Sequence, residues 1–392
     1  MGLLREFLNA RISLPELKTN IRKRYIMAVL IITERNDIHG SALIWALNRM
    51  GVRCDRWSLS EFPEQQCTSV RISNSSDPQF RVSGLSDTYQ SIWARRMARP
   101  AAISPGLASA DVEMALMQAR QSCEGVRSIF SPQSVWINPL DAGEKADLKP
   151  QQLLAARKAG FAIPETLLSN DPAEIRRFYG ENGGKVICKF FTPALWKNRV
   201  TGALSAVFTA PLTQELLEDD AAFISCPAIY QRYVQKKSDV RITFFGSSYH
   251  AVRIWSQRSS MGAVDFRSDL RFESPMEPME LGPEILERCM ELSSQLGLLH
   301  GSYDFVEGPD GSFTFLEINE MGQFLWLEEQ LPQLPLLSIF AAFSLDPRPD
   351  FRFDQGQWPS HSFPAFLQSE AYPAFQTDCD RVAAANPFWY PE

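Results

Sequence analysis

The 392-residue chain has few histidines and no closely spaced cysteines, and these shortages argue against two common kinds of site. Its four histidines are far apart in the sequence, and none has the spacing of zinc ligands. The seven cysteines are odd in number and include no Cys-x-x-Cys pair. This pattern indicates reduced thiols in a cytoplasmic protein, with neither a disulfide framework nor a zinc site.

The chain also lacks a long apolar run, an excess of positive charge and a dinucleotide-binding glycine motif. No stretch of about 18 uncharged apolar residues occurs, so we expect no membrane partner. The net charge of −7 argues against nucleic acid as a partner. No G-x-G-x-x-G follows the first apolar run. The hydrophobic content of 45%, by contrast, is enough to fill the cores of two or three domains.

The first 26 residues differ from the rest because they carry six basic and two acidic side chains. They include no apolar run of the kind found in a secretory signal. Two interpretations stay open: a short accessory helix, or a natural start at Met27 with an added extension upstream.

A strand–helix–strand pattern opens the next part of the chain. The apolar run at residues 28–33 predicts a buried parallel strand, residues 41–50 predict a helix, and residues 52–57 predict a second strand. This βαβ pattern predicts an α/β domain over residues 27–140.

The remaining sequence, at residues 141–344, predicts helices and strands in alternation. An Asn-Gly-Gly sequence at 182–184 indicates a hairpin turn. A final helix is expected to begin near residue 325. Seven prolines and many aromatic residues in the tail, 345–392, indicate an irregular surface segment. The expected elements are helices at 148–160 and 284–298 and strands at 185–191, 228–234, 239–245, 248–255, 303–307 and 313–318.

The strongest chemical signal is a group of oxygen-bearing side chains in the late hairpin. Glu317 and Asn319 are two residues apart, so they point to the same face of a strand, and Asp304 lies on the facing strand. Two carboxylates and an amide oxygen suit Mg²⁺, which keeps its other positions for water and phosphate. The sequence therefore predicts a magnesium site at Asp304, Glu317 and Asn319.

Two lysines form the second signal. Lys189 ends an apolar strand, where an ammonium group is costly unless it meets an anion. A nucleotide phosphate is the economical partner. Lys149 heads a helix and is a second candidate for phosphate binding.

The third signal follows the strand that ends near residue 234. The backbone of residues 231–234 can pair with the edge of an adenine ring. Asp239 and Arg241 then lie on one face of the next strand. Arg241 and Arg267 can neutralise a phosphoryl group during transfer.

Taken together and in this order, these residues resemble the ATP-grasp superfamily. Short segments extend the likeness to its microviridin-type, or graspetide, peptide-modifying ligases, and the resemblance covers about residues 28–340. These segments are Trp93-Ala-Arg-Arg96, Trp136-Ile-Asn-Pro139, Ser256-Gln257, Asp265-Phe-Arg267 and Gly322-Gln-Phe-Leu-Trp326.

The resemblance implies an α/β and α+β fold, in which an N-terminal α/β pre-grasp domain precedes two ATP-grasp lobes with nucleotide between them. The central lobe would be residues 141–230 and the C-terminal lobe residues 231–344. Its implied cofactors are ATP and Mg²⁺. Lys149 and Lys189 would hold phosphates, residues 192–202 would cover them, and Asp239 would approach the ribose. The adenine would lie against Gln231, Arg232, Tyr233 and Val234.

The implied reaction joins a carboxylate to a hydroxyl or amine through an acyl phosphate, in a ribosomal precursor peptide. Lys189, Arg241 and Arg267 would be the catalytic residues. Two alternatives stay open: a ligase that adds an amino acid to a small molecule or a protein terminus, and a nucleotide-binding regulatory protein without turnover.

Substrate contacts are expected at two further places. Glu284, Glu287 and Glu291 lie on one face of the helix predicted at 284–298 and would receive a basic leader segment. Arg95 and Arg96 are further candidates. Ligases of this superfamily often form dimers, so a homodimer is expected as well.

Overall fold

The computed structural model describes most of the chain after the basic N-terminal segment. The expected helix or extension at 1–26 lies outside the described residues, as does most of the expected phosphate-covering loop at 192–202. The described residues are 28–104, 106–191, 208–260, 262–269 and 271–385, together with the backbone of 195–197 and 204–206.

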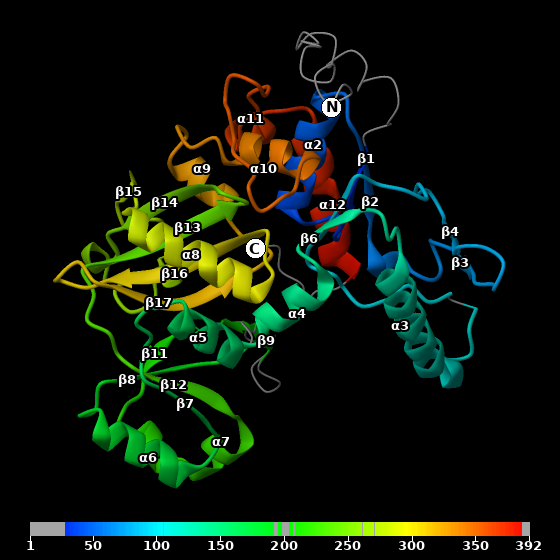
Figure 1. The fold of residues 1–392 in the computed structure, drawn as a ribbon. Helices are drawn as coiled ribbons and strands as arrows, with labels where there is room; N and C mark the ends of the chain where they lie inside the picture. Colours follow the sequence, from blue (N-terminus) through cyan, green and yellow to red (C-terminus); the bar gives the residue numbers. More distant parts are fainter. Residues whose placement is uncertain are drawn as a thin grey trace, which may run out of the picture.

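A four-stranded parallel sheet, ordered β2-β1-β5-β6, forms the N-terminal part of the molecule (Figure 1). Successive side chains of β1 enter two different cores: Val29 and Ile31 pack on one face, and Leu30 and Ile32 on the other. Because both faces of β1 are buried, every residue of the run at 28–32 is apolar. The strands are β1 (Ala28–Ile32), β2 (Arg53–Trp57), β5 (Ser91–Ala94) and β6 (Val135–Ile137).

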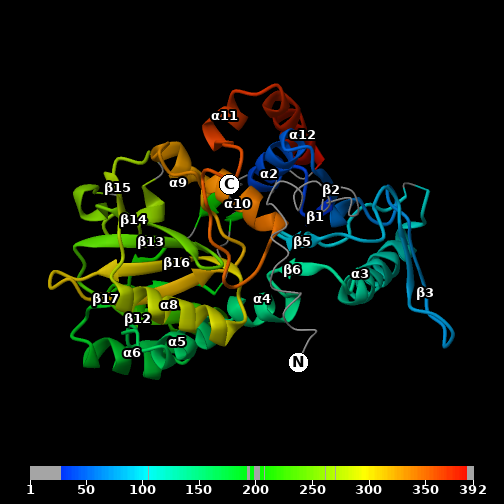
Figure 2. The same ribbon diagram turned by 45° about the horizontal axis from the view of Figure 1, so that its top comes forward.

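Helices pack on both faces of this sheet. Helix α2 (Ile38–Arg49) begins after Asp37, whose carboxylate accepts a hydrogen bond from the Gly40 amide at 3.1 Å. Helix α3 (Val112–Ile129) packs on the opposite face. A two-stranded antiparallel hairpin, β3 (Thr68–Arg71) and β4 (Gln79–Val82), projects beside it (Figure 2).

A second sheet, ordered β11-β8-β12-β7, has antiparallel pairing throughout. Helix α6 (Pro172–Glu181) starts at its cap Asp171, and residues 182–184 turn the chain from α6 into β8. The hairpin predicted at 182–184 is therefore wrong, because a glycine turn also ends a helix. The strands are β7 (Thr166–Ser169), β8 (Val186–Lys189), β11 (Ala210–Pro211) and β12 (Ala228–Arg232), and a second helix is α7 (Asp220–Ser225).

Part of the expected loop after β8 is a strand. Residues Leu195–Lys197 form β9, which pairs antiparallel with β10 (Leu204–Ala206).

The third sheet is antiparallel, ordered β15-β14-β13-β16-β17, and helices α4, α5 and α8 cover one face of it (Figure 1). Val240, Ile242 and Phe244 of β13 pack against those helices, so Asp239 and Arg241, at alternate positions, lie on the other face. The elements are α4 (Leu140–Asp147), α5 (Lys149–Lys158), β13 (Ser238–Phe245), β14 (Ser248–Ile254), β15 (Met276–Met279), α8 (Pro283–Leu296), β16 (His300–Glu307) and β17 (Phe313–Asn319).

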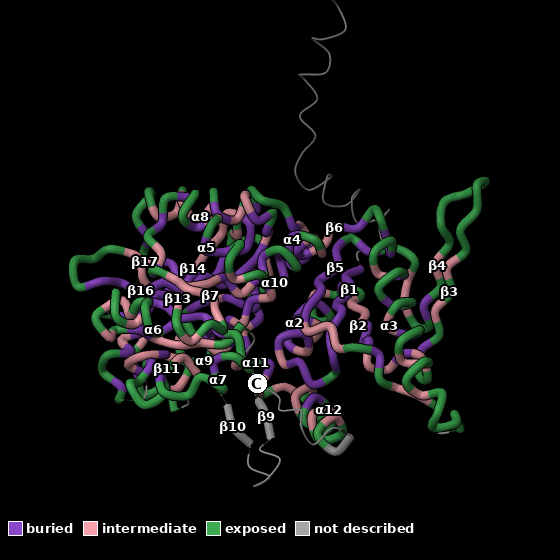
Figure 3. The backbone as a smooth tube through the Cα atoms, turned by 90° about the horizontal axis from the view of Figure 1, so that it is seen from below, coloured by how far each residue is buried: buried purple, intermediate pink, exposed green. Residues whose placement is uncertain are grey.

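Residues 363–367 and 371–385 of the tail are helical, and Phe351 and Phe366 are buried in the core. The expectation of an irregular surface segment is therefore wrong for these parts, whereas residues 346–362 are irregular. Helix α10 is buried along its whole length (Figure 3). The buried side chains of Phe351 and Phe366 belong to the same core. Helix α9 is followed by three more helices. The four are α9 (Leu325–Gln330), α10 (Leu336–Leu345), α11 (Phe363–Leu367) and α12 (Ala371–Ala385). None of the described helices is long and apolar enough to span a bilayer.

Candidate active site

A pocket lies between the second and third sheets and collects most of the predicted site residues. Lys189 reaches it from the end of β8, residues 231–234 from the end of β12, and Asp304 and Glu317 from β16 and β17. Its apolar lining includes Ile187, Val306 and Leu316. The site therefore combines charged groups with an apolar wall.

The connection after β12 offers hydrogen-bonding groups to a flat ligand. The Tyr233 amide donates to the Lys185 carbonyl at 2.8 Å, which fixes the chain direction. Among the described residues, the Val234 amide has no acceptor, and Oε1 of buried Gln231 has no donor. A heterocycle with both a donor and an acceptor on one edge, such as adenine, fits these two groups.

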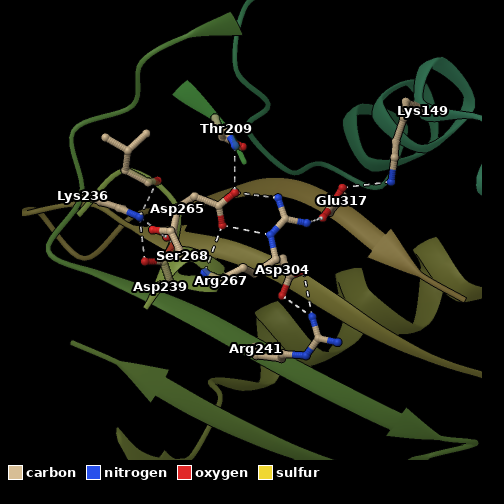
Figure 4. Close-up of polar contacts among 11 residues, drawn as sticks. Lys149, Thr209, Lys236, Asp239, Arg241, Asp265, Arg267, Ser268, Asp304 and Glu317 are labelled. Carbon is tan, nitrogen blue, oxygen red and sulfur yellow. Dashed lines mark hydrogen bonds and ion pairs between the residues drawn. The ribbon is translucent and has the colours of Figure 1, made fainter. Parts of the chain in front are cut away.

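Asp304 and Glu317 lie opposite each other, since their Cα atoms are partners in the β16–β17 pairing. Glu317 accepts hydrogen bonds from Lys149 Nζ at 2.9 Å and from Arg267 Nη1 at 3.0 Å (Figure 4). Asp304 accepts two from Arg241 Nη1, at 2.8 and 2.9 Å. The predicted juxtaposition of the two carboxylates is confirmed.

The charges around Glu317 determine its protonation. Burial alone would raise the pKa of Glu317, but the cationic groups of Lys149, Arg267 and Lys189 lower it far below its usual range. Burial raises the pKa of Asp304, against the effect of Arg241. Burial lowers the pKa of Lys189, and the Glu317 carboxylate opposes that shift. Glu317 is thus ionised at any physiological pH.

Asp265 holds Arg267 in place. From the sequence, Asp265 was given no role of its own and was named only within the segment Asp265-Phe-Arg267. Its carboxylate accepts hydrogen bonds from Arg267 Nε at 2.9 Å and Nη2 at 2.8 Å, and from the Thr209 amide at 3.2 Å. Arg267 therefore joins Asp265 to Glu317 across the pocket (Figure 4). The short Asp-x-Arg spacing was the signal that could have found it.

Lys236 was missed by the sequence reasoning. Its ammonium group is buried and contacts both oxygens of Asp239, at 2.9 and 2.7 Å, and the Val264 carbonyl at 3.1 Å. Asp239 also accepts a hydrogen bond from Ser256. Asp239 lines the pocket, as expected, but its carboxylate is already engaged.

Two predicted site residues lie elsewhere than expected. Arg241 is buried behind Asp304 and does not line the pocket, because its guanidinium is taken up by Asp304 and by the Gln323 carbonyl at 2.7 Å. Arg95 is only 1% exposed and is paired with Asp37, so it does not face a substrate. The expected catalytic contact by Arg241 and the expected substrate contact by Arg95 are therefore wrong.

The other predicted site residues are the expected metal ligand Asn319 and the expected substrate contacts at Arg96 and on α8. Asn319 pairs with Ser302 at the end of β17 and is half-buried. Arg96 is half-buried with φ of +43°. Glu284, Glu287 and Glu291 are exposed on α8, on the face of the third sheet that points away from the pocket.

The donor set fits a hard cation together with an anion. Two carboxylates on neighbouring strands and an amide oxygen nearby are oxygen ligands, which Mg²⁺ prefers. Within the described residues, no three His, Cys, Asp or Glu side chains are grouped around one point, so water or a ligand would have to complete such a site. Lys149, Lys189 and Arg267 supply the positive charge that a polyphosphate needs.

Solved structures with this architecture are numerous, although no family model and no curated protein matches the sequence. The macrocyclase MdnC from Microcystis aeruginosa, bound with precursor peptide MdnA, is 27% identical with a TM-score of 0.70, over 82% of this chain and 100% of that one. A Chryseobacterium gregarium RiPP-associated ATP-grasp ligase, in complex with ADP and a leader and core peptide, is 25% identical with a TM-score of 0.73, over 83% and 99%.

The macrocyclase MdnB from Microcystis aeruginosa matches at 23% identity with a TM-score of 0.66, which supports the fold alone. These matches define the class: the chain has the ATP-grasp fold, and it is an ATP-grasp ligase. Within that class it is similar to the ligases associated with ribosomally made, modified peptides, as the sequence resemblance predicted.

Proposed function

We propose that this protein uses ATP to join a side-chain carboxylate to a hydroxyl or amine within a ribosomally made precursor peptide. The observation that carries the proposal is the pocket where Glu317 is surrounded by Lys149, Lys189 and Arg267, beside a connection suited to adenine. The likeness to a macrocyclase bound with its precursor peptide and to a ligase bound with ADP supports the same reading.

ATP would lie between the lobes at 141–230 and 231–344, which follow an α/β domain at 27–140. Gln231 and Val234 would contact adenine, and Lys149 and Lys189 the phosphates. Asp304, Glu317 and Asn319 would hold Mg²⁺, which supplies charge neutralisation for the phosphates. On binding, Lys149 would exchange part of its contact with Glu317 for a phosphate oxygen.

The chemistry needs no covalent protein nucleophile. The substrate carboxylate oxygen attacks the γ-phosphorus, the bond to the ADP oxygen breaks, and an acyl phosphate forms. A hydroxyl or amine of the peptide then attacks the acyl carbon, loses its proton, and releases inorganic phosphate. The net products are ADP, phosphate and one ester or amide. Positioning and charge neutralisation supply most of the catalysis.

Arg267 would hold the acyl phosphate. It lines the pocket, its side chain is 43% exposed, and Asp265 fixes its orientation from behind. A guanidinium in this position can bind the transferring phosphoryl oxygens as a fork. Arg241, in contrast, would act by holding Asp304.

The leader of the peptide would dock on the acidic stripe of α8. Glu284, Glu287 and Glu291 are exposed there, although Glu284 also contacts Arg288. Because the stripe faces away from the pocket, reversing its charges should weaken peptide binding and leave ADP binding unchanged. Unchanged peptide affinity in the triple Glu→Lys variant would discard this docking site.

Two further parts of the proposal concern the whole protein. The described cysteines are all free thiols, which suits a cytoplasmic location. A homodimer is the expected assembly, and sedimentation of the purified protein would test it.

The decisive experiment combines mass spectrometry with detection of ADP. The protein is incubated with Mg²⁺, ATP and a candidate peptide encoded next to its gene. Each bond formed should remove one water from the peptide mass and release one ADP. A peptide of unchanged mass with no ADP release, from a panel that includes free amino acids as acceptors, would contradict the proposal. Turnover with the amino acids alone would favour the small-molecule alternative.

A further inference from the structure

The carboxyl edge of the N-terminal parallel sheet makes hydrogen bonds with the segment 320–325. This segment directly follows β17, the strand that carries Glu317. Arg95 and Asn138 come immediately after β5 and β6, and Asp37 and His39 follow β1. In open α/β sheets this edge commonly binds a ligand. Here the edge is occupied by the chain's own backbone, and the N-terminal sheet lies beside the third sheet (Figures 1 and 2).

Arg95 makes the central contacts. Its Nε donates to both oxygens of Asp37, at 3.1 and 2.9 Å. Its Nη1 donates to the carbonyl oxygens of Met321 at 3.1 Å and Gly322 at 2.6 Å. Arg95 and Asp37 are each about 1% exposed, so the ion pair is shielded from solvent and its geometry is fixed.

His39 and Asn138 hold the rest of the segment. His39 Nε2 accepts hydrogen bonds from the amides of Phe324 at 3.1 Å and Leu325 at 3.2 Å, which requires a neutral imidazole. The Asn138 amide donates to the His300 carbonyl at 2.9 Å and the Glu320 carbonyl at 3.0 Å. The backbone of 320–325 is thus fixed at both ends and in the middle.

The segment is also connected to the pocket. Arg241 donates to the Gln323 carbonyl with Nη2 and to Asp304 with Nη1, so a shift of the segment displaces a pocket carboxylate. Glu317 lies only three residues before the segment, on the same strand end. Gly322 has φ of +63°, and a Cβ there would come within 2.3 Å of His300 Nε2, so the close approach admits only glycine.

We propose that Arg95 is a positioning residue for the reaction: it fixes segment 320–325 and thereby the orientation of Asp304 and Glu317 at the metal and phosphates. The inference rests on the proposed function for the chemistry it serves. It also explains why the Trp-Ala-Arg-Arg, Trp-Ile-Asn-Pro and Gly-Gln-Phe-Leu-Trp sequences occur in one chain, since their residues meet in this contact.

The test compares Arg95→Lys with Arg49→Lys, a change at an exposed position in the last turn of α2, away from this contact. Lysine keeps the charge next to Asp37 but lacks the fork that reaches the carbonyls of 321 and 322. We expect Arg95→Lys to lower kcat about 100-fold, because small misplacements of catalytic groups have effects of this size. The Mg²⁺ concentration for half-maximal ADP binding should rise, while Mg²⁺-free ADP binding stays unchanged.

A second variant, Arg95→Ala, removes the guanidinium and leaves a cavity of its shape. Added guanidinium chloride at low concentration should restore part of the Mg²⁺-dependent ADP affinity in this variant and have no such effect on the wild type. If Arg95 only stabilised the fold, the folded Arg95→Ala protein would already have the Mg²⁺-dependent ADP affinity of the wild type, and guanidinium would restore nothing. If Arg95→Ala does not fold, the Arg95→Lys comparison alone decides.

The outcome that overturns the proposal is an Arg95→Lys protein with wild-type kcat and wild-type Mg²⁺ dependence of ADP binding. Calorimetry of ADP and Mg²⁺ binding needs no peptide, so it tests the positioning role even where turnover is absent. Absent turnover in the wild type, with a clear Mg²⁺ effect on ADP binding, would count against the proposed ligase reaction and leave the positioning role intact.

Discussion

Glu317 is the residue on which the electrostatics of the site depend, because three cationic groups face its one carboxylate. We predict that Glu317→Gln, which keeps the size and removes the charge, lowers turnover by about 100-fold or more. Lys149 and Arg267 stay available, so ADP should still bind without Mg²⁺, and the Mg²⁺ enhancement of binding should be lost. Glu124→Gln, at an exposed position on α3, is the matched control, and equal turnover in the two variants would refute the assignment.

Asp37 provides a pH prediction. Burial alone would raise its pKa, but the charge of Arg95 dominates and lowers the pKa of Asp37 to about 2. A lowered acid pKa gives stability that is fully present above the ordinary value of about 3.9 and is lost as the pH falls toward about 2. A shift of this size corresponds to roughly 2–3 kcal/mol of unfolding free energy.

Urea unfolding at several pH values checks this. Asp37→Asn should be less stable than the wild type at pH 7, and the gap between the two should shrink as the pH falls below about 4. Unfolding free energies that stay equally far apart at every pH would show that Asp37 does not have the lowered pKa.

For single residues, the sequence could indicate which neighbouring side chains share a face of a strand. It could not indicate which side chains from distant elements they contact. Two residues of spacing placed Glu317 and Asn319 on one face, and the hairpin turn brought Asp304 opposite. No such local rule shows that Arg241 would face Asp304, or that Arg95 would pair with Asp37 across 58 residues. Long-range ion pairs depend on how the sheets dock, which periodicity does not encode.

Among the elements, helix α11 tests how firmly the tail is packed. Phe366 is 1% exposed and lies against Trp45, Tyr372 and Phe375. We predict that Phe366→Ala lowers the unfolding free energy by about 3 kcal/mol, the usual effect of emptying a buried aromatic site. Ile224→Ala, at a position 58% exposed, should change it by less than about 0.5 kcal/mol. Equal stability of the two variants would mean that the tail is not docked in solution.

The tail also shows where element prediction failed. Prolines and aromatic residues were read as irregular structure, yet Pro364 lies in the first turn of α11, where proline suits a helix. The strand at 28–32 was predictable because its apolar pattern is local. The aromatic residues of the tail are instead explained by helix α10, which is buried on all sides and is covered in part by the segment that follows it.

In the whole molecule, the pocket joins two sheets that share no hydrogen-bonded strand. Residues from β8 and β12 face residues from β13, β16 and β17 across it, so a nucleotide bound there contacts both sheets. Such a ligand binds the folded protein only, and at 100 times its Kd it adds about 2.7 kcal/mol to the unfolding free energy. We therefore predict that ADP with Mg²⁺ raises the melting temperature.

The choice of variant shows whether the stabilisation comes from this pocket. Lys189→Met keeps the apolar stem of the side chain but removes the ammonium group that faces the pocket, so the ADP-induced shift should be largely lost while the ligand-free melting temperature changes little. Lys145→Met, at an exposed position on α4, should keep the full shift. A wild-type melting temperature that does not move at millimolar ADP and Mg²⁺ would mean that the two sheets do not enclose a nucleotide, and the ligase proposal would then lose its physical basis.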